Sequence, residues 1–140
     1  MKPTATCVAA LLMAVATSAG ACGYCVDDKV AAAYDHAVTE RAFAQGHEIA
    51  FLSLDLARPA TRDTETAIRN AIERVPGVDR DSVRVALEAG GLSLAFDPKR
   101  APAGSLLNAL DAAVAPLGAR TALLRFGNPG RSAAGGRSTQ

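Results

Sequence analysis

Residues 83–96 read VRVALEAGGLSLAF, and this stretch decides the fold class. Apolar residues alternate with other residues on both sides of the glycine pair Gly90-Gly91. The alternating positions are Val83, Val85 and Leu87 before the pair, and Leu92, Leu94 and Phe96 after it. A period of two is typical of strands, and a glycine pair permits a tight turn between them. The stretch therefore predicts a β-hairpin.

The segment before the hairpin predicts a strand and then a helix. In IAFLSLDL (49–56), leucines alternate with Ser53 and Asp55, which indicates a strand. A loop containing Pro59 follows. Apolar residues then recur at the i, i+3, i+4, i+7 spacing of an amphipathic helix, namely Ile68, Ala71, Ile72 and Val75. Pro76-Gly77 ends this helix.

The segment after the hairpin predicts a helix and then a strand. Asp97-Pro98 ends the hairpin, and a second helix is indicated by Leu107, Leu110 and Val114. Leu124 and Phe126 indicate a last strand. The order over residues 48–126 is β-α-β-β-α-β, which is the order of a ferredoxin-like sandwich with two helices on one face of the sheet. The sequence therefore predicts the α+β class.

One further helix is predicted before this unit. Residues 26–45, VDDKVAAAYDHAVTERAFAQ, are rich in alanine and contain neither Pro nor Gly until Gly46. Asp27 and Asp28 lie in the first turn, where carboxylates interact favourably with the helix dipole. The prediction is thus a ferredoxin-like βαββαβ sandwich preceded by an extra N-terminal helix. This helix either covers the open face of the sheet or projects away from it.

Both ends of the chain lie outside the predicted domain. Residues 1–21 carry Lys2 near their start, continue with an apolar run and end with small residues, which is the order of a secretory signal peptide. The apolar run has about 10 residues, whereas a membrane span needs roughly 20. We expect cleavage before Cys22 and export to the periplasm or the exterior. Residues 127–140, rich in Gly, Ser and Arg, predict a disordered tail.

Two local patterns resemble the heavy-metal-associated domain, the ferredoxin-like module of soft-metal chaperones and metal-pumping ATPases. One is AIRNAIERVPGV (67–78), a helix that ends in Val-Pro-Gly-Val, and the other is FDPKRAPAGSLLNAL (96–110). The resemblance covers residues 47–126, preceded by a separate segment, 22–46. It implies a protein that binds or delivers a soft metal ion, copper(I) or zinc.

The family's metal loop is altered in this chain. Its two cysteines lie between the first strand and the first helix, at positions that correspond here to Thr61 and Thr64. A thiolate is a soft anionic ligand, whereas a neutral hydroxyl is hard and stays protonated. We therefore expect this loop not to bind copper(I). Thr61, Asp63 or Thr64 is expected to cap the helix instead, which contributes about 1 kcal/mol.

A Cys-x-x-Cys pair occurs elsewhere, in ACGYCVDD (21–28). Cys22 and Cys25 stand just before the predicted N-terminal helix, so two thiolates could close on one metal ion there. Asp27 and Asp28 add negative charge nearby and oppose thiolate formation. Our leading hypothesis is an exported soft-metal binding or delivery protein that uses Cys22 and Cys25 and is not an enzyme.

Three alternatives remain for the cysteine pair. Cys-Gly-Tyr-Cys at a helix start is similar to thioredoxin-type redox sites, although no strand precedes it here. Cys22 as first mature residue could instead carry a lipid and bring the protein to a membrane, although Ala19 stands where lipoproteins have leucine. The third alternative is an inert or disulfide-bonded pair on a module that binds a protein partner.

The two histidines, His36 and His47, do not complete a zinc site with the cysteines. Their spacing differs from that of zinc fingers. On one straight helix, His36 would lie roughly 16 Å from Cys25 at 1.5 Å per residue. Both histidines are expected to be solvated surface residues.

Composition excludes several other functions. The formal net charge is +1 and the chain has no Trp, two Tyr and four Phe, so neither a basic face nor aromatic stacking indicates nucleic-acid binding. No Ser-His-Asp arrangement or glycine-rich phosphate loop is recognisable, so a hydrolase is not expected. The remaining partners are a metal ion and a protein.

Overall fold

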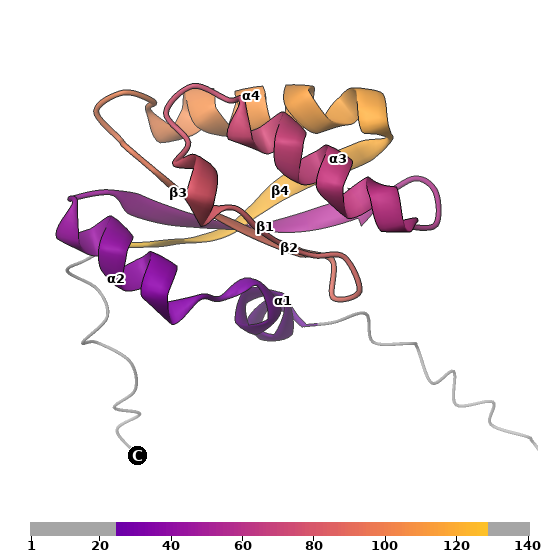
Figure 1. Cartoon of the computed structure of the whole chain (residues 1–140), viewed down its shortest axis with the longest axis horizontal. Helices are drawn as coiled ribbons and strands as arrows, with labels where there is room; N and C mark the ends of the chain where they lie inside the picture. The colour runs from indigo at the N-terminus through magenta and orange to yellow at the C-terminus, as the bar shows by residue number, and fades with distance from the viewer. Residues whose placement is uncertain (1–24, 129–140) are drawn as a thin grey trace, which may run out of the picture.

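The structure, a computed structural model, describes residues 25–128 (Figure 1). Its helices and strands are α1 (Val26–Ala33), α2 (His36–Ala44), β1 (Glu48–Leu56), α3 (Arg62–Glu73), β2 (Arg84–Ala86), β3 (Gly91–Phe96), α4 (Ala103–Val114) and β4 (Ala119–Gly127). Two short 3₁₀ turns, Arg80–Ser82 and Ala115–Leu117, precede β2 and β4. The expected signal peptide and nearly all of the expected tail lie outside the described residues.

The four strands form one antiparallel sheet in the order β2-β3-β1-β4. This order, with one helix after β1 and one after β3, is compatible with a ferredoxin-like fold. The predicted hairpin is confirmed as β2 and β3, which pair from Arg84↔Ser93 to Ala86↔Gly91. β4 pairs with β1 from Ile49 to Leu56, with one register shift at Phe51/Leu52. Its last residue, Gly127, lies within the predicted tail.

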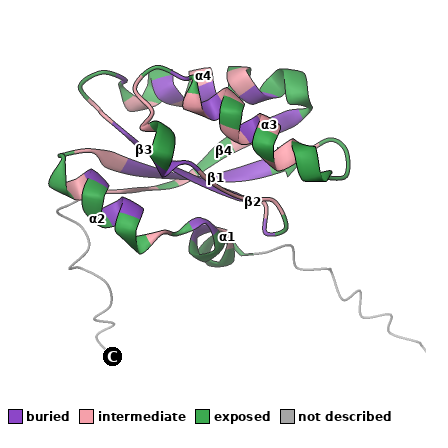
Figure 2. Cartoon of the chain, in the orientation of Figure 1, coloured by how far each residue is buried: buried purple, intermediate pink, exposed green. Residues whose placement is uncertain are grey.

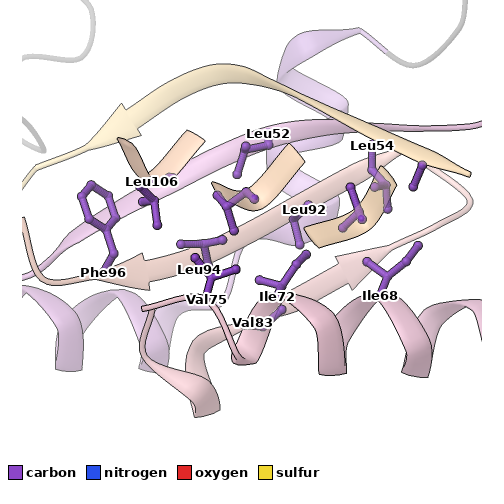
Figure 3. Close-up of a cluster of buried hydrophobic side chains, with 14 of the residues drawn as sticks. Leu52, Leu54, Ile68, Ile72, Val75, Val83, Leu92, Leu94, Phe96 and Leu106 are labelled. Carbon is purple, nitrogen blue, oxygen red and sulfur yellow. The ribbon is translucent and has the colours of Figure 1, made fainter. Parts of the chain in front are cut away.

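The main core lies between the sheet and helices α3 and α4, which cover the same face of the sheet (Figures 1 and 3). The amphipathic pattern explains this placement, because Ile68 and Ile72 of α3 and Leu106 and Leu110 of α4 are all turned inward. Strand β3 is buried along its whole length. The fully buried side chains of this core include Leu52, Ile68, Ile72, Val83, Leu92, Leu94, Phe96, Leu106, Leu110 and Val114.

The other face of the sheet is covered by α1 and α2 (Figure 1). The prediction of one helix over residues 26–45 is wrong, because the chain is extended at Tyr34 and Asp35 between two separate helices. Asp35 is the N-cap of α2, and its carboxylate accepts a hydrogen bond from the N–H of Val38 over 3.1 Å. An aspartate at this position stabilises a new helix start more than it stabilises a continuous helix.

The second core is smaller than the first. It consists of Val30, Val38, Ala42, Ile49, Phe51 and Ala95, with Phe43 and Leu124 packed against it. Figure 2 shows buried residues on α1 and α2 beside exposed ones, as expected for helices that bury one side. Of the two positions considered for the N-terminal segment, it therefore adopts the one that covers the open face of the sheet.

The outer edge of β4 is partly protected by α4. The N–H of Thr121 donates to Oδ1 of Asp111 over 3.0 Å, so this amide of an edge strand is bonded within the chain. Charged residues and irregularities protect edge strands in the same way, and β4 carries Arg120, Arg125 and the register shift. Within residues 25–128, no helix has the length and apolar character needed to cross a membrane.

Candidate functional site

Cys25 is the N-cap of α1, and its thiol is exposed. It forms a capping box with Asp28: the Cys25 side chain faces the N–H of Asp28, and the N–H of Cys25 donates to Asp28 Oδ2 over 3.2 Å. The first helical hydrogen bond runs from the N–H of Lys29 to the C=O of Cys25 (3.0 Å). The candidate ligand therefore stands at an ordered helix start and faces solvent.

Cys22, the second predicted ligand, lies outside the described residues, so its distance from Cys25 is not part of the structure. Among residues 25–128, no group of three or more His, Cys, Asp or Glu side chains is arranged to hold a metal ion. The only predicted metal ligand within this range is Cys25. Its exposed thiol has the soft chemistry that copper(I) or zinc prefers.

The loop in which the sequence resemblance would place a metal site is a helix cap. Thr61 is the N-cap of α3, its N–H donates to Oγ1 of Thr64 over 2.9 Å, and the two hydroxyl oxygens lie 2.9 Å apart. The expectation that Thr61 or Thr64 caps this helix is confirmed. The helix begins at Arg62, within the segment that the sequence suggests as a loop. This donor set does not fit a soft metal.

The two histidines lie in different environments. His36 is exposed at the first position of α2, and its Nδ1 lies 3.3 Å from the hydroxyl of Tyr34. His47 was expected to be solvated, but its side chain is only 20% exposed and its Nδ1 lies 2.6 Å from Asp79 Oδ2. Because α1 and α2 are separate helices, the single-helix distance from Cys25 to His36 no longer applies.

Helix α1 lies unusually close to β3. A Cβ atom built on Gly91 would lie 2.4 Å from the carbonyl oxygen of Lys29. Ser93 Oγ donates to the carbonyl oxygen of Ala33 over 2.5 Å, at the other end of α1. Two residues of β3 therefore contact the backbone of the helix that begins with Cys25.

An ion pair fixes the junction between α1 and α2. Nε of Arg84 donates to Asp35 Oδ2 over 2.8 Å, and Asp35 also accepts from the N–H of Val38. These interactions, the Val38 N–H first and the Arg84 guanidinium second, lower the pKa of the Asp35 carboxyl. Neither the contact of Arg84 with Asp35 nor that of Gly91 with Lys29 is recognisable from sequence alone, since each joins residues more than 45 positions apart in the printed sequence.

An open cleft of about 630 Å³ lies beside edge strand β2. Its lining combines the start of α3, the β2–β3 turn and one residue of α1: Ala32, Ala60, Thr61, Arg62, Glu65 and residues 85–89. The walls are mostly apolar and the charged groups are of both signs. Its lining contains no Cys or His, so it offers no soft metal ligand.

No family model matches this chain, and no curated protein matches it either. Among solved structures, the chain is similar to the crystal structure of oxidized MerP from Ralstonia metallidurans CH34, with 22% sequence identity. That match covers 55% of this chain and 96% of that chain, with a TM-score of 0.44. The chain thus has a structural likeness to oxidized MerP, and its own strand order defines the architecture described above.

Proposed function

We propose that this chain is an exported protein that binds or delivers a soft metal ion, copper(I) or zinc, through Cys22 and Cys25. The observation that supports the proposal most directly is the exposed thiol of Cys25 at the N-cap of α1. Cys22 precedes it by three positions, the spacing at which two sulfur ligands can hold one ion.

The surroundings of Cys25 suit capture and release of an ion. Backbone N–H groups at a helix start carry a partial positive charge, which favours anionic ligands. Asp27 and Asp28 are exposed in the same turn, and their negative charges oppose that effect. The cysteine thiolates would therefore be favoured only when a bound metal cation supplies positive charge. The metal is cargo in this proposal, and no chemical step follows its binding, so the protein is not an enzyme.

Anaerobic copper(I) titration of the reduced, exported protein tests the proposal. Wild type should bind one ion per chain, or one ion per two chains if two molecules share it through four thiolates. The Cys22→Ser/Cys25→Ser variant should lose this binding. Equal uptake by both proteins would end the idea.

A matched control separates this site from the threonine loop. The Thr61→Ala/Thr64→Ala variant removes both hydroxyls of the α3 capping box and leaves both cysteines in place. It should bind copper(I) as wild type does. Loss of binding in this control would instead locate the metal near α3.

Intact-mass spectrometry of the exported protein tests the alternatives for Cys22. A mature chain that begins at an unmodified Cys22 fits metal binding by both sulfurs. An acylated Cys22 would consume one ligand and point to a lipoprotein. A mass two hydrogens lower, with no metal uptake after reduction, would favour a redox or structural disulfide.

A further inference from the structure

The main core of the domain contains no side chain from α1 or α2. Its buried side chains come from the sheet, from α3 and α4, and from the segments that connect them. All four strands follow α2 in the chain, so α1 and α2 add no strand to the sheet. The sheet, α3 and α4 therefore pack together by themselves, and residues 26–44 lie on the other face of the sheet (Figure 1).

The apolar contact between residues 26–44 and the sheet is small. The buried side chains that meet in it are Val30, Val38 and Ala42 from the helices and Ile49, Phe51 and Ala95 from the strands. None of those from the helices is larger than valine, whereas the main core contains leucine, isoleucine and phenylalanine. Since the stabilisation grows with the apolar area removed from water, this segment is held less firmly than the main core.

Polar interactions strengthen this contact at the junction of the two helices. Ser93 Oγ donates to the C=O of Ala33, the last residue of α1, and Nε of Arg84 donates to Oδ2 of Asp35, the N-cap of α2. Arg84 and Ser93 lie directly opposite each other in β2 and β3. Because α1 and α2 share this junction, neither helix can leave the sheet without disturbing the attachment of the other.

The connection from α2 to β1 has the properties of a hinge. Gly46 has φ +73°, and a Cβ built on it meets no atom within 4 Å. The N–H of His47 donates to the C=O of Ala42 across this glycine, over 2.9 Å. The side chain of His47 is fixed to the domain, because its Nδ1 lies 2.6 Å from Asp79 Oδ2. A rotation at Gly46, the residue type with the most backbone freedom, would therefore move residues 26–44 and leave β1 in place.

We infer that α1 and α2 form a strap (residues 26–44) that opens from the sheet as one unit, with Gly46 as its hinge. The open state exposes the apolar face formed by Ile49, Phe51 and Ala95 and leaves the main core intact. Elements held by few buried apolar contacts open in this way at a lower free energy than global unfolding. The strap therefore controls whether this face meets solvent. The inference is independent of metal binding, since it uses only contacts between the strap and the sheet.

Native-state hydrogen exchange of the full chain in increasing urea tests the inference. The hydrogen-bonded amides of α1 and α2 should exchange at least about 10-fold faster than those of β1 and β3. Their rates should share one urea dependence, weaker than that of the strand amides, because opening exposes less surface than unfolding. Equal rates in helices and strands would mean that the strap leaves only when the domain unfolds. Different urea dependences in α1 and α2 would mean that they open separately, and either result overturns the inference.

Ser93→Ala and Ser53→Ala form a matched pair of variants for the same experiment. Both serines are buried on the face that the strap covers, since Ser93 pairs with Phe51 and Ser53 follows Phe51 by two positions. Ser93 bonds to the strap, whereas Ser53 Oγ donates to the C=O of Ala122 in β4 over 3.4 Å.

Loss of the Ser93 hydrogen bond should accelerate exchange about five-fold in both helices of the strap, although Ser93 contacts only α1. Ser53→Ala should leave exchange in the strap unchanged. An acceleration in α1 alone, in neither helix, or to the same extent in both variants would contradict opening of the strap as one unit.

Discussion

Thr61 and Thr64 show how a single residue type decides between a metal site and a helix cap. Their hydroxyl oxygens lie 2.9 Å apart, at the position where the resemblance implies two cysteines. Replacing each oxygen with sulfur would place two soft ligands within reach of one ion, since a zinc–sulfur bond is about 2.3 Å long. The side chains of Thr61 and Thr64 therefore approach each other at the start of α3, and their hydroxyl groups lack the soft chemistry of thiolates.

The Thr61→Cys/Thr64→Cys variant should therefore gain copper(I) binding. Made in the Cys22→Ser/Cys25→Ser background, it is expected to bind one ion per chain in anaerobic titration. Helix α3 should lose up to about 1 kcal/mol of capping free energy, because a thiol is a weaker cap than a hydroxyl. Thr61→Cys alone serves as the control, and equal binding by the single and double variants would show that the loop does not form a two-ligand site.

Asp35 contributes an acid-sensitive interaction to the junction between α1 and α2. Its pKa is lowered in the folded protein, first by the N–H of Val38 and then by Arg84. A lowered pKa means that this carboxylate contributes stability above its unfolded value, near 3.8, and loses it as the pH falls through the lower folded value. The acid-sensitive range of the α1–α2 junction therefore lies below about pH 4.

Asp35→Asn should remove this pH dependence. Asparagine is also a good N-cap, so the hydrogen bond from Val38 is kept while the charge facing Arg84 is lost. Hydrogen exchange of α1 and α2 at pH 6 should be faster in the variant than in wild type, and the difference should shrink near pH 3. A difference that stays constant between these pH values would show that the charge of Asp35 plays no part.

Single residues also mark the limit of what the sequence predicts. The Thr61 cap could be anticipated because cap and helix are adjacent in the chain. The pairing of His47 with Asp79 could not, because the two are separated by 32 positions and meet only after the sheet has formed. Interactions between residues close in the chain can be predicted from a sequence, whereas contacts between residues that only the fold brings together cannot.

At the scale of elements, Gly77 determines how α3 connects to the rest of the sheet. It has φ +88°, and a Cβ built on it would lie 2.4 Å from the Cβ of Ala101 in the loop before α4. Both the left-handed backbone and the close contact require glycine. The turn after α3 and the loop before α4 can therefore pack together only with glycine at this position.

Gly77→Ala should lower the free energy of unfolding by about 1–3 kcal/mol, because the variant must accept a strained backbone. Urea unfolding measures this change. In the Gly77→Ala/Ala101→Gly variant, the steric conflict is relieved and part of the loss should be recovered. A stability equal to wild type in Gly77→Ala would mean that the turn adopts another conformation at no cost.

The helices and strands were predicted in the right order because each has its own hydrophobic period. The exception is the segment 26–45, where the alanine-rich composition indicated one helix. The sequence signal for the break is Asp35, an N-cap residue within the segment, which accepts a hydrogen bond from the N–H of Val38 three positions later. Two shorter helices form instead of one, because each can bury one side against the sheet.

At the scale of the whole molecule, the sheet is the middle layer between two cores of unequal size. Leu110 is fully buried in the larger core, and Val38 is 5% exposed in the smaller one. The larger core contains most of the buried side chains of β1, β3, α3 and α4. We therefore expect the cores to differ in how much of the fold depends on them.

Leu110→Ala should destabilise the whole domain by about 2–5 kcal/mol. Val38→Ala deletes two methyl groups and should cost about 1–2 kcal/mol. Urea unfolding measures the loss of unfolding free energy in each variant, and hydrogen exchange shows which elements are destabilised. Exchange should rise throughout the sheet in Leu110→Ala, but mainly in α1 and α2 in Val38→Ala; the reverse pattern would show that the small core stabilises the fold.

The architecture of this domain was predictable, but the position of the N-terminal helices was not. Residues 48–126 alternate and repeat in ways that specify which faces are apolar. For the α1–α2 segment, the decisive contacts are a backbone approach at Gly91 and a hydrogen bond from Ser93, and neither produces a hydrophobic pattern. Pairing of Cys22 with Cys25 stays a prediction for the same reason, because it depends on spacing alone.

The bond from Thr121 to Asp111 has a consequence for how the protein behaves when many copies are present. Cross-β aggregation begins when a strand of another molecule pairs with the unbonded backbone N–H groups of an edge strand. Here one such amide is already occupied by a carboxylate of the same molecule, and two flanking arginines would repel an identical strand. High local abundance is therefore compatible with a dispersed population of monomers.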